Sequence, residues 1–205
     1  LPNAYAYAPS FITAFIAATA TKVSVYVFAR FFFGIFGAAY SFRLLHIEYF
    51  IVPLALLGIF VASTVAVFQT NIKRRLAYSS IAQIGYMMLG LGFASVTGLT
   101  ACLVHLFNHA LMKGALFLAM GCVAYRMGAV DLRAMRGLGR RMPVTMAAFV
   151  LSGLSLIGVP LTVGFVSKWY LVQAALERGW WPVAVLVLAG SLIAVVYVWR
   201  VIEVA

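Results

Sequence analysis

Three groups that can carry a proton recur every four residues inside one apolar stretch of the sequence. His105, His109 and Lys113 lie within Leu103–Tyr125, which is otherwise mostly Leu, Phe, Met, Ala and Val. On an α-helix a step of four residues turns about 400°, so the three side chains stay within an arc of about 80° and form one polar stripe about 12 Å long. Titratable groups are costly inside a membrane span, so this stripe indicates a site that carries protons or ions.

Two further lysines, Lys22 and Lys168, lie in apolar segments far from any loop. A charged lysine at the centre of a lipid-facing helix costs about 2.5–3.5 kcal/mol, whereas removing the proton from an ordinary lysine at pH 7 costs roughly 4.6 kcal/mol. Because these free energies are of the same order, a lysine held there can take up and release a proton, and a histidine does so with little adjustment. We predict a relay of five proton-carrying side chains: Lys22, His105, His109, Lys113 and Lys168.

No carboxylate is available inside an apolar segment to hold these charges. The four acidic residues all lie in loops or at segment ends: Glu48, Asp131, Glu177 and Glu203. The spacing of His105 and His109 also fits a zinc site, but no Cys or Glu lies beside them to complete the ligand shell. We therefore predict no metal and no cofactor.

Simpler structural roles remain open for each of these residues. A lysine in a membrane helix can extend its amine to the interface, and Lys168 is the most open to that interpretation. His105 and His109 can also serve only as hydrogen-bonding groups between helices.

The composition is that of a polytopic membrane protein. Hydrophobic residues make up 65% of the chain and charged residues only 9%, against about 45–50% and about 25% in soluble domains. The net charge of +11 does not indicate nucleic-acid binding, because the basic residues lie between apolar segments, where they set topology. The lipid bilayer is therefore the expected surroundings of the chain.

The apolar segments predict an all-α fold with about six transmembrane helices. Each segment is near the length of about 20 residues that a span requires. The segments cover roughly residues 10–36, 49–69, 79–97, 101–125, 144–176 (with a break) and 181–204.

The distribution of basic residues predicts the orientation in the membrane. One side would hold nine of them: Lys73, Arg74, Arg75, Arg126, Arg133, Arg136, Arg140, Arg141 and Arg200. The other side would hold Arg30, Arg43 and Arg178. We therefore expect loops 71–78 and 126–143 to be cytoplasmic.

The fifth apolar segment contains a helix-breaking pattern at its middle. Pro160 lies between Gly158 and Gly164, and proline removes a backbone donor and clashes with the preceding turn. A helix broken inside a membrane is tolerated only where protein or a water-filled cavity satisfies the freed backbone groups, and such helices mark ion sites in transporters. Lys168 follows the break by two turns.

Two stretches of the sequence resemble the signatures of a known family. The run from Lys73 to Tyr86 reads KRRLAYSSIAQIGY, and the run from His105 to Leu118 reads HLFNHALMKGALFL. Further matches lie in the following loop and broken helix: Gly137, Met142, Pro143, Gly158, Pro160, Gly164, Phe165, Ser167 and Lys168. These features resemble the antiporter-like family: the proton-pumping membrane subunits of respiratory complex I, the large subunits of Mrp-type cation/proton antiporters and those of membrane-bound hydrogenases.

The resemblance implies a fold of two inverted five-helix repeats, each with a broken helix. Residues 1–205 would form a single transmembrane fragment of a longer protein. Residues 10–36 would be the last helix of the first repeat, and residues 49–204 would form the second repeat.

The resemblance also implies a role for each basic residue. Lys22 would link two half-channels, and Lys168 would end the hydrophilic axis on the broken helix. Lys73 would lie where protons reach the axis from the cytoplasmic side. The three remaining members of the axis would be His105, His109 and Lys113.

The expected function is that of a proton-translocating subunit, without a redox site of its own, in a bacterial or archaeal plasma membrane. Its partners would be the other membrane subunits of the complex, for example an NADH:quinone oxidoreductase. Two alternatives stay open. The run Tyr197–Glu203 is slightly more similar to Mrp-type antiporters, which would make sodium a second transported ion, and a non-transporting membrane scaffold would use the same polar residues only to hold helices together.

Overall fold

The computed structural model describes residues 1–205 and confirms the all-α fold. Two π-helical turns, η1 (Phe31–Ile35) and η2 (Ala39–Leu44), follow the second helix. The α-helices are α1 (Pro2–Tyr7), α2 (Ser10–Arg30), α3 (Glu48–Phe68), α4 (Ile72–Gly92), α5 (Val96–Met127), α6 (Leu138–Arg141), α7 (Pro143–Ile157), α8 (Val163–Glu177) and α9 (Trp181–Val204). The extended backbone contributes one isolated bridge, between Asn71 and Asp131.

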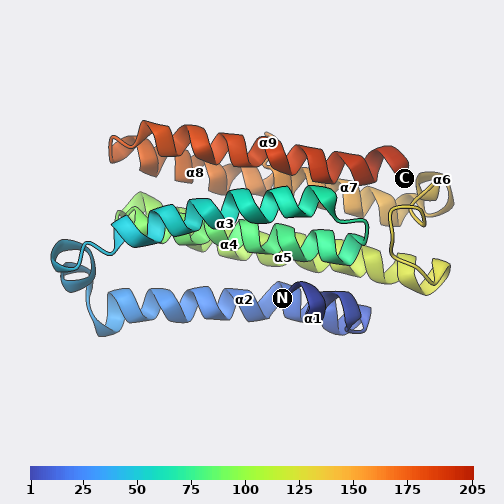
Figure 1. The fold of residues 1–205 in the computed structure, drawn as a ribbon, viewed down its shortest axis with the longest axis horizontal. Coiled ribbons are helices and arrows are strands. Elements are labelled where there is room, and N and C mark those ends of the chain that lie inside the picture. The colour runs from blue at the N-terminus through green and yellow to red at the C-terminus, as the bar shows by residue number, and fades with distance from the viewer.

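The long helices lie side by side along one axis, and α5 is the element that joins them (Figure 1). Helix α5 packs against α2 and α4, and also against both α7 and α8. Helices α7 and α8 run end to end beside α9, and α2 lies on the opposite side of the bundle (Figure 1). A polar stripe on α5 can therefore face several other helices at once.

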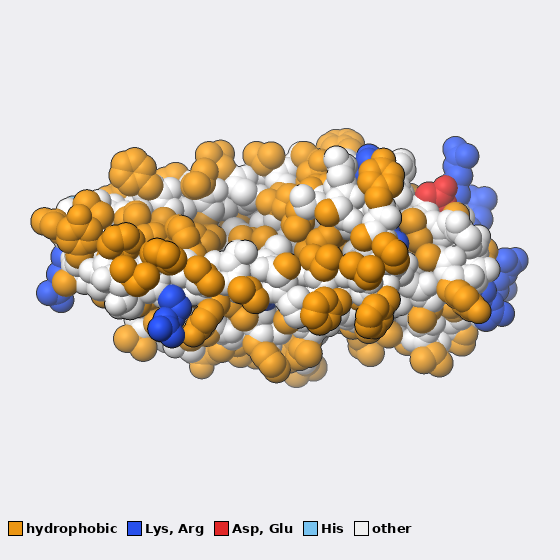
Figure 2. Space-filling view, turned by 90° about the horizontal axis from the view of Figure 1, so that it is seen from below, with side chains coloured by type: hydrophobic (Ala, Val, Ile, Leu, Met, Phe, Trp, Pro, Cys, Tyr) orange, Lys and Arg blue, Asp and Glu red, His pale blue; other side chains and the backbone are white.

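Four helical stretches are long and apolar enough to cross a membrane: Ser10–Ile35, Glu48–Phe68, Val96–Met127 and Trp181–Val204. The other two predicted spans are also helical, but α7 and α8 have 15 residues each and α4 contains several polar side chains. The total of six spans stays a prediction. The surface agrees with a membrane setting, because hydrophobic side chains cover the middle of the molecule and Lys and Arg gather mostly towards its two ends (Figure 2).

The prediction that residues 71–78 form a loop is wrong. Helix α4 already begins at Ile72, and the side chain of Asn71 caps it by accepting a hydrogen bond from the backbone N–H of Arg74 at 3.0 Å. The three basic residues that follow depress the hydropathy of this turn, so an apolarity criterion misses it. Helix α5 begins at Val96, five residues before the predicted segment 101–125, and the side chain of Ser95 caps it by accepting a hydrogen bond from Gly98 N–H.

The break in the fifth apolar segment lies where the sequence predicts it. Helix α7 ends at Gly158, whose φ of +90° suits glycine. Helix α8 begins after Thr162, whose hydroxyl accepts a hydrogen bond from Phe165 N–H. Because Pro160 has no N–H, the carbonyl of Leu156 loses the donor that a continuous helix would supply.

Gly164 lets the first turn of α8 pack directly on α7. A Cβ atom at this position would lie 1.7 Å from the carbonyl oxygen of Ser155, which is backbone and cannot move aside easily. The hydroxyl of Ser155 also accepts a hydrogen bond from Gly164 N–H at 3.2 Å. Contact between α7 and α8 at this level therefore requires glycine.

We predict that Gly164→Ala lowers the stability of the complete subunit by about 1–3 kcal/mol or more, because the added methyl group overpacks the junction. Thermal unfolding of the purified protein measures this effect. The matched control is Gly58→Ala on α3, where a Cβ would have no atom within 4 Å. Equal unfolding temperatures for the two variants would contradict the close approach of α7 and α8.

Candidate functional site

The three lysines of the predicted relay all point into the protein. The exposed fractions are 4% for Lys22, 0% for Lys113 and 5% for Lys168. They come from α2, α5 and α8, and α5 packs against both of the other helices. The interpretation that these amines extend to the membrane interface is therefore wrong for this structure.

The amine of Lys113 is held by the first half of α4. It donates hydrogen bonds to the carbonyl of Leu76 at 2.7 Å and to the hydroxyl of Ser79 at 2.5 Å. Ser79 itself donates to the Leu76 carbonyl at 2.9 Å. All of these acceptors are neutral, so the amine is solvated by hydrogen bonds without a carboxylate that would hold its charge in place.

His105 joins α5 to two neighbouring helices. Its Nδ1 lies 2.8 Å from the hydroxyl oxygen of Ser167 on α8, and its Nε2 lies 2.9 Å from Oε1 of Gln83 on α4. The ring of His109 stacks on it with centroids 6.1 Å apart and planes 9° from parallel. Both ring nitrogens of His109 are buried without a hydrogen-bond partner in the protein. Such unpaired buried nitrogens are unusual in folded proteins.

Lys168 lies at the break between α7 and α8. Its amine donates to the carbonyls of Leu156 and Ile157, at 3.2 and 2.7 Å, and to the hydroxyl of Ser191 at 2.9 Å. It also lies 4.7 Å from the centroid of the Tyr86 ring, a cation–π distance. The carbonyl end of a helix favours a positive charge, so the helix break supplies the amine with its partners.

Lys22 faces the stripe on α5 from α2. Its amine donates a hydrogen bond to the carbonyl of Ala17 in its own helix. Helix α2 packs on α5, the helix that carries His105, His109 and Lys113, and the Lys22 side chain is buried. We treat the buried groups from the three helices as one cluster. In it, His105 connects the α5 stripe to Ser167 on α8, and Ser167 directly precedes Lys168.

Sequence reasoning missed the neutral members of this cluster. Ser79, Gln83 and Tyr86 recur at spacings of four and three, so they share one face of α4, and this periodicity was the available signal. Ser167 directly precedes Lys168, but nothing in the sequence shows that its hydroxyl reaches His105. Ser191, on α9, carried no signal.

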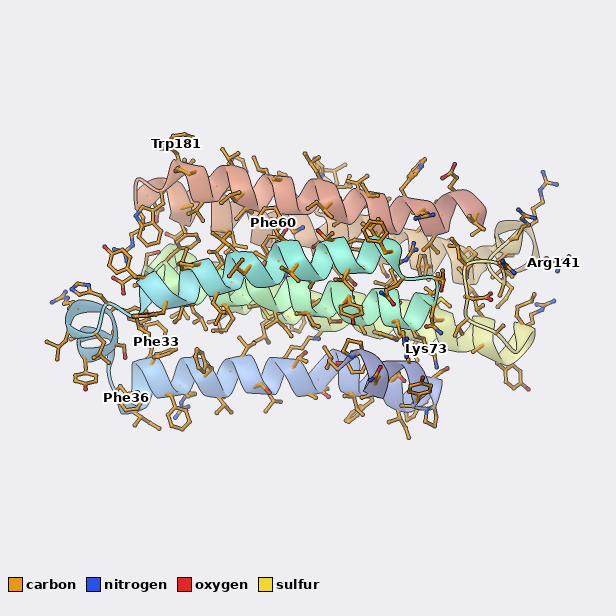
Figure 3. All side chains as sticks on the ribbon, viewed as in Figure 1. Phe33, Phe36, Phe60, Lys73, Arg141 and Trp181 are labelled. Atoms are coloured by element: carbon orange, nitrogen blue, oxygen red, sulfur yellow. The ribbon has the colours of Figure 1, made fainter.

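Lys73 lies apart from the cluster, at the end of the molecule that also carries Arg141 (Figure 3). It is buried in the first turn of α4, and its amine donates to the carbonyl of Ala8 at 3.3 Å. The next residue, Arg74, donates to the hydroxyl of Tyr7 at 3.2 Å. These contacts tie the α1–α2 junction to α4, and a role for Lys73 in proton access stays a prediction. No three His, Cys, Asp or Glu side chains come together as a metal site.

Comparison with known proteins gives consistent matches over nearly the whole chain. Residues 1–194 match the family described as NADH:quinone oxidoreductase/Mrp antiporter, transmembrane. NADH-quinone oxidoreductase subunit N of Desulforudis audaxviator is 42% identical over 205 residues, which cover 99% of this chain and 40% of that protein. F(420)H(2) dehydrogenase subunit L of Methanosarcina mazei is 37% identical over 209 residues, which cover 95% of this chain and 30% of that protein.

Two solved structures share the fold. The Mrp complex from Dietzia sp. matches with a TM-score of 0.92 and 30% identity, covering 100% of this chain and 37% of the matched one. The membrane-bound sulfane sulfur reductase, an archaeal respiratory membrane complex, matches with a TM-score of 0.88 and 35% identity. This match covers 99% of this chain and 41% of the matched one. The chain spans about 40% of the length of most of the curated relatives that it matches.

Proposed function

Because the chain belongs to the NADH:quinone oxidoreductase/Mrp antiporter family of transmembrane proteins, we propose that it forms the proton-translocating part of an antiporter-like subunit. The observation that carries this proposal is the buried cluster itself. Five basic side chains from α2, α5 and α8 are buried inside an apolar bundle, and none of them forms an ion pair with a carboxylate: Lys22, His105, His109, Lys113 and Lys168.

In the proposed mechanism a proton passes along the cluster between Lys113 and Lys168. The amines of both lysines bind only neutral carbonyl and hydroxyl oxygens. A neutral amine keeps two donors, which match the two acceptors of Lys113 and the two carbonyls at Lys168, so each lysine can lose its proton without leaving those groups unpaired. His109 and His105 lie on α5 between the two lysines as groups that can take up and release a proton. The unpaired nitrogens of His109 support a hydrated connection at this point.

The driving force would come from partner subunits. Moving one proton against 100 mV requires about 2.3 kcal/mol, and the cluster described here only conducts. The matched structures are of multi-subunit membrane complexes. We therefore propose other membrane subunits as partners and a bacterial or archaeal plasma membrane as the location.

We also propose the orientation and the repeat assignment given by the sequence. The connection over residues 126–143, which includes the end of α5 and the short helix α6, carries Arg126, Arg133, Arg136, Arg140 and Arg141, and it would face the cytoplasm together with Lys73. Residues 10–36 would close one inverted repeat, and residues 49–204 would form the next. The broken helix of this second repeat, at Gly158, Pro160 and Gly164, would set the depth of Lys168.

A second candidate function is sodium–proton exchange through the same cluster. The match to the Mrp complex structure favours it, since that fold agrees over the full chain. The test is transport by the complete complex in sealed vesicles, with and without sodium. We expect that proton movement continues at the same rate without sodium, because the cluster offers no carboxylate to bind a hard cation. If proton movement strictly required sodium, the result would favour sodium–proton exchange. If the vesicles showed no ion flux at all, the result would favour a non-transporting scaffold.

A further inference from the structure

The two ring nitrogens of His105 each face an oxygen atom that can accept a hydrogen bond. The Ser167 hydroxyl lies 3.0 Å from the carbonyl of Gly164 and 2.8 Å from Nδ1 of His105, and its single hydrogen can serve the carbonyl. Its oxygen therefore faces Nδ1 of His105 as an acceptor, and Nδ1 keeps its proton. On the other side Nε2 faces Oε1 of Gln83, which also accepts. This arrangement solvates an imidazolium ring, with one acceptor at each nitrogen.

The Gln83 amide has a second possible orientation. A half turn about its last side-chain bond exchanges the oxygen and the NH2 group, which have nearly the same shape. In the turned orientation the NH2 group donates to Nε2, which suits a neutral ring protonated only at Nδ1. Gln83 can therefore pair with His105 in both of its charge states.

The far side of the Gln83 amide meets a partner that accommodates both orientations. The Gln83 NH2 nitrogen and the Tyr197 hydroxyl are each buried without a hydrogen-bond partner, and Tyr197 on α9 lies beside Gln83 and Ser79. Arg75 fixes this turn of α9 against α4 by donating to the Tyr197 carbonyl at 3.1 Å. A phenol hydroxyl both donates and accepts, so Tyr197 suits either face of the amide.

We propose that Gln83 is a positioning residue whose amide turns with each protonation and deprotonation of His105, and that Tyr197 is its fixed outer partner. This inference rests on the proposed proton translocation. In it, a neutral side chain controls the uptake and release of the proton by His105. While the ring is neutral, the amide NH2 group faces Nε2; when a neighbouring relay group transfers a proton to Nε2, the amide turns and its oxygen accepts from the new N–H. The N–H bond formed at Nε2 replaces the one broken on the relay group that supplies the proton, and the reverse exchange passes the proton to the next group, so no further reactant is needed.

Charged and titratable groups from several neighbouring elements lie around His105. Their effect on the charge state of His105 is the same in every variant of Gln83. The facing groups are Lys22 from α2, Tyr86 from α4, His109 from α5 itself and Lys168 from α8. None of them is a carboxylate. A substitution of Gln83 by Glu would therefore introduce the first negative charge into the site.

The test is the pH profile of proton translocation per turnover of the driving reaction, measured with the complete complex in sealed vesicles. Gln83→Met removes the acceptor that solvates the charged ring, so the alkaline limb of the profile should move down by about 1 pH unit. Gln83→Glu has nearly the same shape and stabilises the charged ring, so this limb should move up by a similar amount. Tyr197→Phe removes a hydrogen-bond partner from both orientations of the Gln83 amide. This variant should therefore slow translocation without moving the alkaline limb of the pH profile.

The matched control is the same pair of substitutions at Gln173, an exposed residue of α8, which should leave the profile unchanged. Shifts of both Gln83 variants in one direction, or no shift, would overturn the inference. If the Gln83→Met complex does not assemble, the shift of the alkaline limb in Gln83→Glu is compared with that in Gln173→Glu. An upward shift in Gln83→Glu alone supports the inference, and any other result contradicts it. Failure of the underlying function looks different, because translocation would then also survive the loss of Lys113.

Discussion

Replacing Lys113 by methionine is expected to abolish proton translocation by the assembled complex. Methionine fills nearly the same volume but cannot carry a proton, and Lys113 is the fully buried amine that α5 presents to α4. No carboxylate or second amine hydrogen-bonds to the same acceptors, Leu76 and Ser79, so nothing replaces its function. The measurement is dye-detected acidification of sealed vesicles, with the driving reaction assayed separately in the same preparation.

Two further variants make the Lys113 result specific. Leu111→Met introduces the same side chain on the exposed face of α5 and should translocate normally. Lys113→Arg keeps the charge but cannot lose its proton near neutral pH, so it should fail like methionine. Normal translocation by assembled Lys113→Met would remove this residue from the route.

Replacing Lys168 by methionine should have two large effects, loss of translocation and loss of stability. The carbonyls of Leu156 and Ile157 accept hydrogen bonds from this amine, and Pro160 cannot supply an N–H in its place. Leaving buried carbonyls unpaired costs about 1–3 kcal/mol each, partly offset because the amine no longer has to be buried. Thermal unfolding should register this as a drop of roughly 2–4 °C for each kcal/mol lost.

Lys22→Met is the comparison that separates these two effects. The Lys22 amine donates only to Ala17 in its own helix and connects no two elements. We therefore expect Lys22→Met to lose translocation while the unfolding temperature changes much less. Equal losses of stability in the two variants would mean that the Lys168 amine does not hold the helix break together.

The helices could be predicted from the sequence wherever apolar length decided the outcome. Residues 181–204 coincide with α9, and residues 49–69 match α3 to within one residue. The start of α4 could not be found in this way, because three consecutive basic residues resemble a loop. In the structure Lys73 and Arg75 are buried on backbone carbonyls. Carbonyl groups of other segments accept hydrogen bonds from these charged side chains. Such contacts depend on the packing of the helices and cannot be predicted from the local sequence.

The same distinction holds for the candidate site. The basic members could be predicted, because a titratable residue inside an apolar segment is unusual enough to be noticed by itself. Gln83 and Ser167 could not, because a neutral polar side chain is common in membrane helices and its importance depends on what it contacts. The distances of 2.9 and 2.8 Å to His105 arise from the packing of α4 and α8 on α5.

The length of α5 keeps the site near the middle of bilayers of different thickness. With 32 residues it is about 48 Å long, while the hydrocarbon layer is about 30 Å thick. Several turns therefore extend past the acyl chains, and His109 lies close to the midpoint of the helix. A lipid mixture that is a few Å thicker or thinner moves the headgroup boundary along the ends of α5, and the charged centre stays equally far from both aqueous phases.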